Sequence, residues 1–524
     1  MSHRALVITI ACLALVALAL RVVRLDDRPP HTDEAVNAWI LGRVLAGDAF
    51  AFDPRDRHGP LLPAAGLVVA TILGRRSFAD LDERTIRLAP AIIGAAATGM
   101  FALGAGLIPN GVLASSAALW ALSPLPIYYA RYGIHETLLV AATLLFLLAL
   151  ARACVAGEMR PRLGWAGLAG FAAGTMVAAK LTALVPLSVA VIALGVSWFS
   201  AGLRGRARPQ AEPRSGSSLA QSARPEASPY PGIAAFALTS LVACTLAYSW
   251  GFTRFAGLHD LVFGLGEPLS RAAGQGHEKG PFYFLGILGH GAFGILFLLA
   301  ALAGALLAWH RGGAVGRALV IYAAGLLLVH SAIPYKTPWL ALGLFLPLAT
   351  LAAWAIAWAL KVGRALRARS DDAITCAARS ERAPYLRAAI YAGLAAFAAV
   401  TVHADYRLVY SEPATEANPL AYAHTSPDLR RLGTLVDSLP GREPLIAVSL
   451  ADPWPLPFLL RREARVGYWQ PGNTLPEDAD LVITAVDDIA SLDVRFASWR
   501  PHYFSQRPGV MLVALQNPGT EVAP

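Results

Sequence analysis

Long apolar runs constrain this chain more than any other feature of its sequence. Eleven such runs alternate with charges and turn residues, and each is near the length of about 20 residues that an α-helix needs to cross a bilayer. We therefore predict an α-helical polytopic membrane protein with about 11 transmembrane helices. The runs are 5–20, 88–108, 111–130, 134–153, 163–179, 182–199, 232–252, 284–309, 317–333, 339–360 and 388–402.

The composition agrees with this class of protein. Of the 524 residues, 56% are hydrophobic and 15% are charged, whereas soluble domains carry about 25% charged residues. This excludes an ordinary soluble enzyme and a disordered chain. The formal net charge is +9, but the arginines lie between apolar runs, where they set membrane topology. We therefore expect membrane lipid as a partner and no nucleic acid.

Two apolar segments leave a choice open. Run 5–20 is either a signal peptide or an uncleaved first span, and we favour the span because more spans follow. Segment 61–74 is only about 14 residues long, which suits an interfacial or re-entrant segment. If it does not cross, four arginine-containing loops share the cytoplasmic side, as the positive-inside rule requires, although Arg75 and Arg76 oppose this. Those loops are 157–162, 201–231, 310–316 and 361–387.

The chain divides into two parts by composition. Residues 1–402 form the expected transmembrane domain, with an outer loop at 24–87 that contains interfacial helices and a Pro-, Ser- and Arg-rich cytoplasmic linker at 201–231. Residues 403–524 are polar and predict a small extracytoplasmic α/β domain. Its expected elements are strands at 445–450, 481–485 and 510–515 and a helix near 428–438. We expect a multi-pass protein of the cell inner (plasma) membrane with its active face extracytoplasmic.

The first outer loop carries adjacent acids beside a histidine. Residues 36–45 have apolar side chains at helical spacing, so His31, Asp33 and Glu34 lie at the start of a surface helix. Asp33 either only caps this helix or takes part in catalysis. A cap needs one small acceptor, so a second acid and a nearby histidine favour catalysis. His58, in the later His-Gly-Pro stretch, is either a base, metal ligand or phosphate donor, or an ordinary interfacial histidine.

The second outer loop and the next membrane edge add three ionisable groups. Arg131 and Glu136 flank a tight loop, and they either pair with each other or Glu136 faces Asp33 across a cavity. Lys180 interrupts two apolar runs, where snorkelling to the headgroups is the ordinary explanation.

Further cations follow in later outer loops. Arg271 and Lys279 lie in a long, glycine-rich loop that either closes over a substrate or merely connects two spans. Tyr335 and Lys336 stand between two prolines at a span mouth, which places the lysine at the level of lipid phosphates. Acids can activate a hydroxyl nucleophile and cations can stabilise a departing phosphate, so the combination fits transfer of a lipid-phosphate-linked sugar.

The order of these motifs resembles the GT-C membrane glycosyltransferases, in the dolichyl-phosphate-mannose protein mannosyltransferase-like branch. That branch usually has His-Pro-Pro where this chain has residues 58–60 as His-Gly-Pro. The chain is closest to the archaeal N-glycosylation flippase-associated membrane protein family, through motifs that span nearly the whole sequence. These are His31-Thr-Asp-Glu-Ala-Val, Asp53-Pro with His58-Gly-Pro, Tyr335-Lys-Thr-Pro-Trp-Leu, Asn418-Pro, His424-Thr-Ser-Pro and Trp454-Pro-Leu-Pro.

The resemblance implies a polyprenyl-phosphate sugar donor, with Asp33 as catalytic acid residue of the first loop and Glu136 as that of the second. The acceptor would be a glycan, lipid or protein. A transporter, a flippase-associated component and a non-catalytic scaffold of glycan assembly are the alternatives. Our candidate catalytic residues are Asp33, Glu34 and Glu136; substrate-binding candidates are His31, His58, Arg131, Arg271, Lys279, Tyr335 and Lys336; and a possible divalent metal ion would use Asp33, His58 and Glu136.

Overall fold

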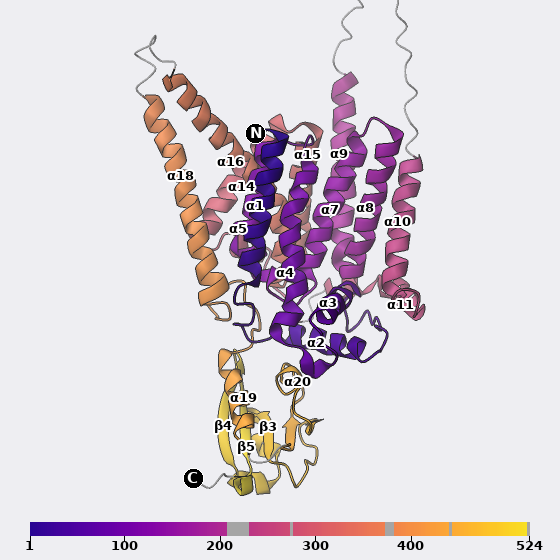
Figure 1. The fold of residues 1–524 in the computed structure, drawn as a ribbon, viewed down its shortest axis with the longest axis vertical. Helices are drawn as coiled ribbons and strands as arrows, with labels where there is room; N and C mark the ends of the chain where they lie inside the picture. The colour runs from indigo at the N-terminus through magenta and orange to yellow at the C-terminus, as the bar shows by residue number, and fades with distance from the viewer. Residues whose placement is uncertain (207–229, 273–275, 372–381, 440–442, 521–524) are drawn as a thin grey trace, which may run out of the picture.

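The fold consists of a bundle of long, roughly parallel helices with a small sheet domain at one end (Figure 1). The structure is a computed structural model that describes residues 1–206, 230–272, 276–371, 382–439 and 443–520. Its long helices are α1 (His3–Val22), α4 (Glu83–Met100), α5 (Asn110–Leu122), α7 (Glu136–Val155), α8 (Met159–Ala179), α9 (Leu184–Arg206), α10 (Tyr230–Tyr248), α14 (Gly291–Arg311), α15 (Gly313–Ala332), α16 (Ala341–Asp371) and α18 (Arg382–Asp405).

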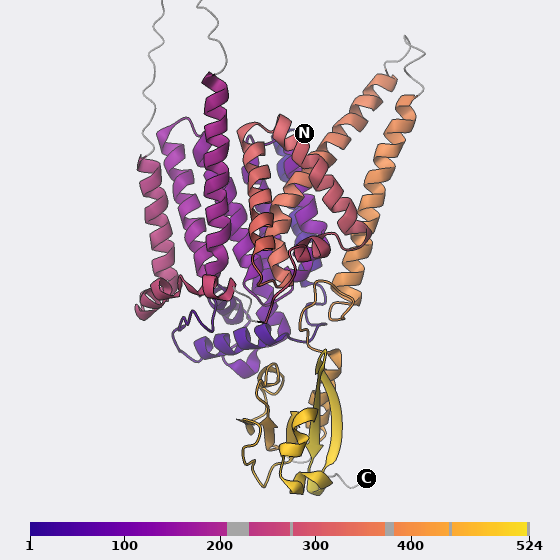
Figure 2. The same ribbon diagram turned by 180° about the vertical axis from the view of Figure 1, so that it is seen from behind.

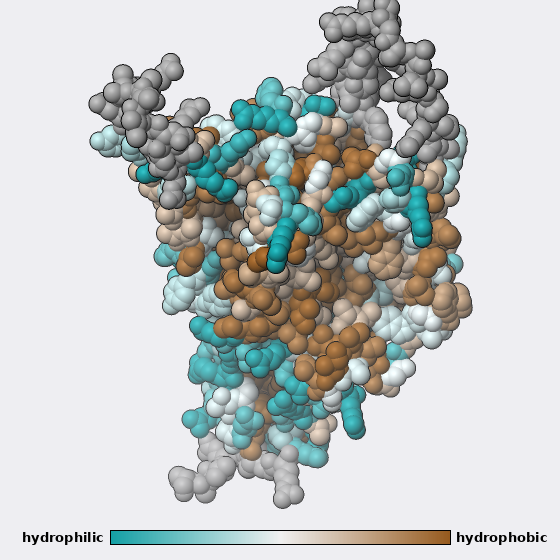
Figure 3. Space-filling model, turned by 45° about the horizontal axis from the view of Figure 1, so that its top comes forward, coloured by the Kyte–Doolittle hydropathy of each residue, from teal (hydrophilic) through white to brown (hydrophobic). Residues whose placement is uncertain are grey.

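Every apolar run of the sequence coincides with a helix or a bent pair of helices, which confirms the polytopic helical class. Eight helices of the described ranges are long and apolar enough to cross a membrane, or nine if one bent pair is a single span. The expected count of about 11 therefore stays a prediction. Figure 3 shows hydrophobic residues covering the middle of the bundle between hydrophilic ends, as a lipid-facing surface requires.

The run at 111–130 was expected to be one helix, but the structure bends it by 55° between α5 and α6 (Pro124–Ala130). Ser123 has an extended backbone and is followed by Pro124 and Pro126. Proline lacks the N–H that would continue the helical ladder and disfavours helical geometry in the residue before it. The bend delivers the second outer loop and Glu136 to the end of the bundle nearest the sheet domain.

The first outer loop folds into α2 (Thr32–Leu45) and α3 (Leu61–Ile72), which lie where the bundle meets the sheet domain (Figure 1). The 12 residues of α3 span about 18 Å, less than the roughly 30 Å of a hydrocarbon core. Short helices occupy the later loops: α11 (Ala256–Gly264), α12 (Glu267–Ala272) and α13 (Tyr283–Leu288).

The opposite end of the bundle carries the N-terminus and the connections to the basic loops (Figures 1 and 2). Helix α9 ends at Arg206 and α10 begins at Tyr230, so most of the linker expected at 201–231 lies outside the described residues. The described helix ends that lead into the arginine-containing loops therefore lie at the end of the bundle opposite the sheet domain.

The C-terminal part is a five-stranded sheet, which confirms the expected small α/β domain. The strand order is β2-β1-β3-β5-β4, with β1 parallel to β2 and β3, and β5 antiparallel to β3 and β4. The three strands expected from the sequence are present, as is the helix near 428–438. The elements are α19 (Arg430–Asp437), β1 (Ile446–Ser449), α20 (Leu456–Leu459), β2 (Val466–Trp469), β3 (Leu481–Ala485), β4 (Arg500–Arg507) and β5 (Val510–Gln516).

The sheet domain is anchored to the first outer loop. Phe458 of α20 is fully buried among apolar side chains of α2, α3 and α4, including Leu41 and Ile86. The Arg461 guanidinium donates to the Leu81 carbonyl and lies 4.1 Å from the centre of the Phe458 ring. The hydroxyl of Thr425 donates to the Pro30 carbonyl at 2.6 Å. These contacts hold the loop that contains the candidate acids against the end of the bundle.

Candidate functional site

His31, rather than Asp33, caps the first outer-loop helix. The Nδ1 atom of His31 accepts a hydrogen bond from the backbone N–H of Asp33 at 3.0 Å, and the Glu34 carboxylate accepts from the His31 N–H at 3.0 Å. Because Nδ1 accepts, the proton of the neutral ring resides on Nε2, which donates to the Tyr422 carbonyl at 3.0 Å. His31 is thus a buried positioning residue, and the Asp33 side chain is not needed as the cap.

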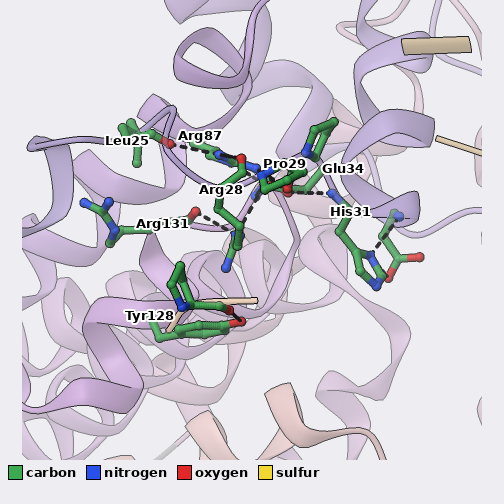
Figure 4. Close-up of polar contacts among 12 residues, drawn as sticks. Leu25, Arg28, Pro29, His31, Glu34, Arg87, Tyr128 and Arg131 are labelled. Atoms are coloured by element: carbon green, nitrogen blue, oxygen red, sulfur yellow. Dashed lines mark hydrogen bonds and ion pairs between the residues drawn. The ribbon is translucent and has the colours of Figure 1, made fainter. Parts of the chain in front are cut away.

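Glu34 lies in a buried ion pair beneath α2. Its two carboxylate oxygens accept from Nε and Nη2 of Arg87, each at 2.7 Å, and both side chains are fully buried (Figure 4). The Gly133 N–H donates to the same carboxylate at 2.8 Å. Burial alone raises the pKa of Glu34, but Arg87 outweighs it and lowers the pKa to about 2. This geometry joins α2 to α4 and argues against the expected catalytic role of Glu34.

Arg131 is also occupied by the protein itself. Its guanidinium donates to the carbonyls of Leu20, Arg21 and Arg24 around the end of α1, at 3.3, 3.2 and 2.7 Å. A cation suits a helix C-terminus, where carbonyls lack helical partners. Figure 4 shows Arg131 turned away from His31. The expected substrate-binding role of Arg131 therefore has no support from its geometry, and it does not pair with Glu136.

Glu136 pairs instead with Lys180. The Lys180 ammonium donates to a carboxylate oxygen of Glu136 at 2.6 Å, and the side chains are only 10% and 5% exposed. Glu136 begins α7 and Lys180 follows the last residue of α8, so the pair joins two helices at their outer ends. Lys180 does not snorkel to solvent, because its charge is satisfied inside the protein.

Several of the candidate residues line one cavity of about 290 Å³, here called the polar cavity. Asp33 contributes a carboxylate whose side chain is 48% exposed, and one of its oxygens lies 3.9 Å from Nδ1 of His31. Since Nδ1 accepts from the backbone, it offers Asp33 no proton. The polar residues of the wall are Asp33, Asn37, Asp56, Arg57, His58, His135, Glu136, Lys180 and Tyr335.

A second cavity of about 150 Å³, here called the mixed cavity, shares part of this wall and extends between the membrane helices. The residues common to both cavities are Arg57, His58, Glu136, Lys180, Tyr335 and Trp339. The rest of the mixed cavity is largely apolar, with Leu139, Val185 and Phe284 among its lining. A charged mouth therefore opens directly into an apolar interior.

Arg57 is a functional candidate that the sequence analysis missed. One of its guanidinium nitrogens donates to the Ala51 carbonyl at 3.1 Å, and the side chain is 25% exposed in the mouth of the polar cavity. Its neighbour His58 lies 5.0 Å, ring centre to ring centre, from His135. Burial, and then Lys180, lowers the pKa of His135 to about 3, so this ring is neutral. The signal for Arg57 was its position beside His58.

The glycine of the His-Gly-Pro stretch has a packing reason. A Cβ atom at Gly59 would lie 2.1 Å from the carbonyl oxygen of Ala178, next to Lys180 at the end of α8. No residue with a side chain fits there without moving the backbone. The departure from the His-Pro-Pro pattern thus lets the His58 loop pack directly on α8.

Two of the cations expected to hold a lipid phosphate, Lys279 and Lys336, line neither cavity. The Lys336 ammonium donates to the carbonyls of Ile333 and Lys279, and the residue is 1% exposed and does not line either cavity. The geometry gives no support to the expected phosphate-holding role of Lys336, because the loop backbone uses its donors, and that role stays a prediction. Lys279 is exposed and contributes its backbone, while the side chain of Arg271 lies outside the described residues. Tyr335, by contrast, lines both cavities.

The candidate metal ligands share the polar cavity without forming a ligand cluster. Within the ranges that the structure describes, no three side chains of His, Cys, Asp or Glu come close enough together to hold a metal ion. Glu136 is already neutralised by Lys180. Of the three expected ligands, this leaves Asp33 and His58, so we derive no step through a metal.

Comparison with known proteins shows the fold. No family model matches the chain, and no curated protein does. Among solved structures, ArnT from Cupriavidus metallidurans bound to undecaprenyl phosphate matches 98% of this chain and 99% of its own, with a TM-score of 0.62 and 17% identity. The Archaeoglobus fulgidus oligosaccharyltransferase AglB, in complex with an inhibitory peptide and a dolichol-phosphate, matches 99% of this chain and 75% of its own, with a TM-score of 0.55 and 14% identity. The chain therefore has the GT-C fold of membrane glycosyltransferases, as the motif order predicted.

Proposed function

We propose that the protein is an integral membrane glycosyltransferase that transfers a sugar from a polyprenyl-phosphate donor to an acceptor hydroxyl. One observation carries the proposal: the carboxylate of Asp33, the cationic guanidinium of Arg57 and the imidazole of His58 line one cavity that continues into an apolar interior. A lipid-phosphate sugar needs this combination, since its head is anionic and its tail is apolar. The two solved GT-C relatives bind polyprenyl phosphates.

Asp33 acts as the general base in this proposal. It accepts the proton of the acceptor hydroxyl while that oxygen attacks the anomeric carbon, and the bond from the anomeric carbon to the phosphate oxygen breaks. The electron pair leaves with the polyprenyl phosphate, so a single displacement inverts the anomeric configuration. Asp33 is suited to this because no hydrogen-bond donor among the described residues occupies its carboxylate.

Arg57 and His58 hold the departing phosphate. Arg57 presents a fixed, always charged group at the boundary between the polar and mixed cavities, where it stabilises the charge that develops on the leaving oxygen. Glu136 and Lys180 also line both cavities, and their ion pair holds the outer ends of α7 and α8 together there. A divalent ion at this position would have to complete its coordination with the substrate phosphate, as Mg²⁺ commonly does.

The active face is extracytoplasmic in this proposal, and the membrane is the cell inner membrane. The support is the distribution of charge: the described helix ends that lead into the basic loops lie at the end of the bundle opposite the cavities and the sheet domain. A reporter fused at Gly157 or Lys361 should therefore be active only in the cytoplasm. A periplasmic signal from either fusion would reverse the orientation and contradict the proposal.

The decisive experiment is incubation of the purified protein with labelled polyprenyl-phosphate sugars and acceptor-containing membranes, with wild type and Asp33→Asn compared. A positioned general base contributes about 10²–10⁴-fold in rate, so Asp33→Asn should lose that much transfer while keeping the melting temperature of the wild type. Asp48→Asn is the matched control, because Asp48 is an exposed acid of the same loop paired only with Arg43. Full transfer by Asp33→Asn would remove Asp33 from the mechanism.

A further inference from the structure

Beyond the mixed cavity lies a third one, nearer the end of the bundle that carries the N-terminus. This apolar cavity has a volume of about 270 Å³. Its wall is almost free of polar groups. The residues that line it include Phe101, Leu107, Leu144, Leu147, Leu148, Ala151, Val155, Ala190, Ala193, Leu194, Val315, Leu319, Tyr322, Leu346 and Pro347.

The apolar cavity continues the mixed cavity along the same four helices. On α15, His330 and Leu326 line the mixed cavity, Tyr322 lines both, and the preceding turns from Leu319 line the apolar one. The other three helices show the same succession. The mixed and then the apolar sections are 136–143 and 144–155 on α7, 185–186 and 190–197 on α9, and 339–343 and 346–350 on α16 and the short 3-10 helix η4 (Pro338–Leu340) before it.

Of the residues that the structure describes, Tyr322 alone lines both the mixed and the apolar cavity. It is 3% exposed, and its hydroxyl has no hydrogen-bond partner among the described residues. A buried hydroxyl without a hydrogen-bond partner is unfavourable, and polar groups between membrane helices usually serve a function. Tyr322 therefore stands at the junction with a donor that the protein itself does not use.

We infer that the apolar cavity receives the distal isoprene units of the lipid donor, and that Tyr322 determines which chain lengths bind. This inference rests on the proposed function. The tail enters from the phosphate end, since Arg57 and His58 mark the opposite limit of the mixed cavity. Tyr322 lies eight positions before His330, a rise of about 12 Å along α15, so a short chain ends before Tyr322 and a long one passes it.

The Tyr322 hydroxyl gains a partner when a long chain passes. Isoprene units carry carbon–carbon double bonds, and an O–H group can donate weakly to such a π system, as donors do to aromatic rings. A short chain leaves the hydroxyl unpaired and the apolar cavity unfilled. Tyr322 is thus a specificity-determining residue for the lipid tail and takes no part in bond making.

The test measures binding of two lipids to the full-length protein in detergent: geranyl phosphate, which has a short chain, and undecaprenyl phosphate, which has a long one. Tyr322→Trp should fill the junction and weaken undecaprenyl phosphate by at least about tenfold, because several buried CH₂ groups lose their site. Geranyl phosphate should bind as it does to wild type, which also shows that the variant is folded. Tyr322→Phe should weaken only the long lipid, by about threefold.

Leu328→Trp is the matched control, since Leu328 lies on the same helix but is 70% exposed on the outside of the bundle. It should leave both affinities unchanged. If Tyr322→Trp weakens both lipids equally, or neither, the inference is overturned while the proposed function stands. If wild type binds neither polyprenyl phosphate, the proposed function itself fails.

Discussion

Asp33 and Glu34 are consecutive residues with opposite surroundings. Glu34 is fully buried and accepts hydrogen bonds from Arg87 and from two backbone N–H groups. Asp33 is 48% exposed in the polar cavity, where no donor of the described residues occupies its carboxylate. A carboxylate that the protein satisfies completely stabilises the fold, whereas one that faces a cavity unsatisfied is available to a substrate.

The cations divide in the same way. Arg131 and Lys336 spend their donors on backbone carbonyls and line neither the polar nor the mixed cavity. Arg57 also donates to one backbone carbonyl and lies 3.7 Å from Asp56, but it lines both the polar and the mixed cavity and its side chain is 25% exposed. The comparison indicates that Glu34, Arg131 and Lys336 stabilise the fold, whereas Asp33 and Arg57 at the cavity mouth are available to a substrate.

The largest expected effect on stability is at Glu34. Glu34→Gln leaves Arg87 as a buried charge without its partner, which should cost about 3–5 kcal/mol of unfolding free energy. The loss should appear as a lower melting temperature and poorer yield in detergent. Asp27→Asn, an exposed acid of the same loop, should change stability by less than about 0.5 kcal/mol. Wild-type stability of Glu34→Gln would remove the contrast with Asp33.

Gly59 tests how closely the His58 loop must approach α8. Gly59→Ala puts a Cβ atom 2.1 Å from the Ala178 carbonyl oxygen, and relieving such overpacking should cost about 1–3 kcal/mol. Transfer should fall as well, because His58 and Arg57 move with the loop. Gly99→Ala on α4 is the control, as nothing lies near its added Cβ. Equal melting temperatures and rates for the two variants would contradict the proposed packing.

The Glu136–Lys180 pair combines both kinds of surroundings, since it is nearly buried, as Glu34 is, yet lines the polar and the mixed cavity. Lys180→Met should destabilise the protein by about 2 kcal/mol, because Glu136 keeps a charge without a partner. Lys180→Met with Glu136→Gln should recover most of that loss. A double variant no more stable than the single one would show that the two residues do not act as a pair.

The sequence predicted the class of fold well because apolar runs near the bilayer length have one solution, a spanning helix. It also predicted the strands at 446–449 and 481–485, whose side chains are mostly apolar and almost all buried. It missed β4, since Arg500–Arg507 has exposed polar residues along its edge position, and β2, whose four residues are only partly buried.

The candidate site was predicted in part. Asp33, His58, Glu136 and Tyr335 do line a common wall, because motifs at span mouths on one side of a membrane can meet only at that surface. Which charged side chains are satisfied by partners inside the protein could not be predicted. Partners such as Arg87 for Glu34 come from distant helices, and the carbonyls that hold Lys336 have no side-chain signature in the sequence.

The smallest expected effect concerns His135, a buried neutral ring beside the cavity. Burial and the Lys180 charge lower its pKa from 6.5 to about 3, so the unfolded chain binds this proton at a higher pH than the folded one does. The stability that comes from keeping the ring neutral is complete above pH 6.5 and is lost as the pH falls toward 3, at about 1.4 kcal/mol per unit.

Melting temperatures measured from pH 7 down to about pH 5 should show this loss, and His135→Gln should flatten the slope relative to wild type, because no imidazole remains to be protonated. Since Glu34 titrates only near its pKa of about 2, it contributes little slope down to about pH 5, where an unfolded glutamate begins to bind its proton. An unchanged slope in His135→Gln would place the acid sensitivity elsewhere and would mean that the wall of the polar cavity admits a charged ring.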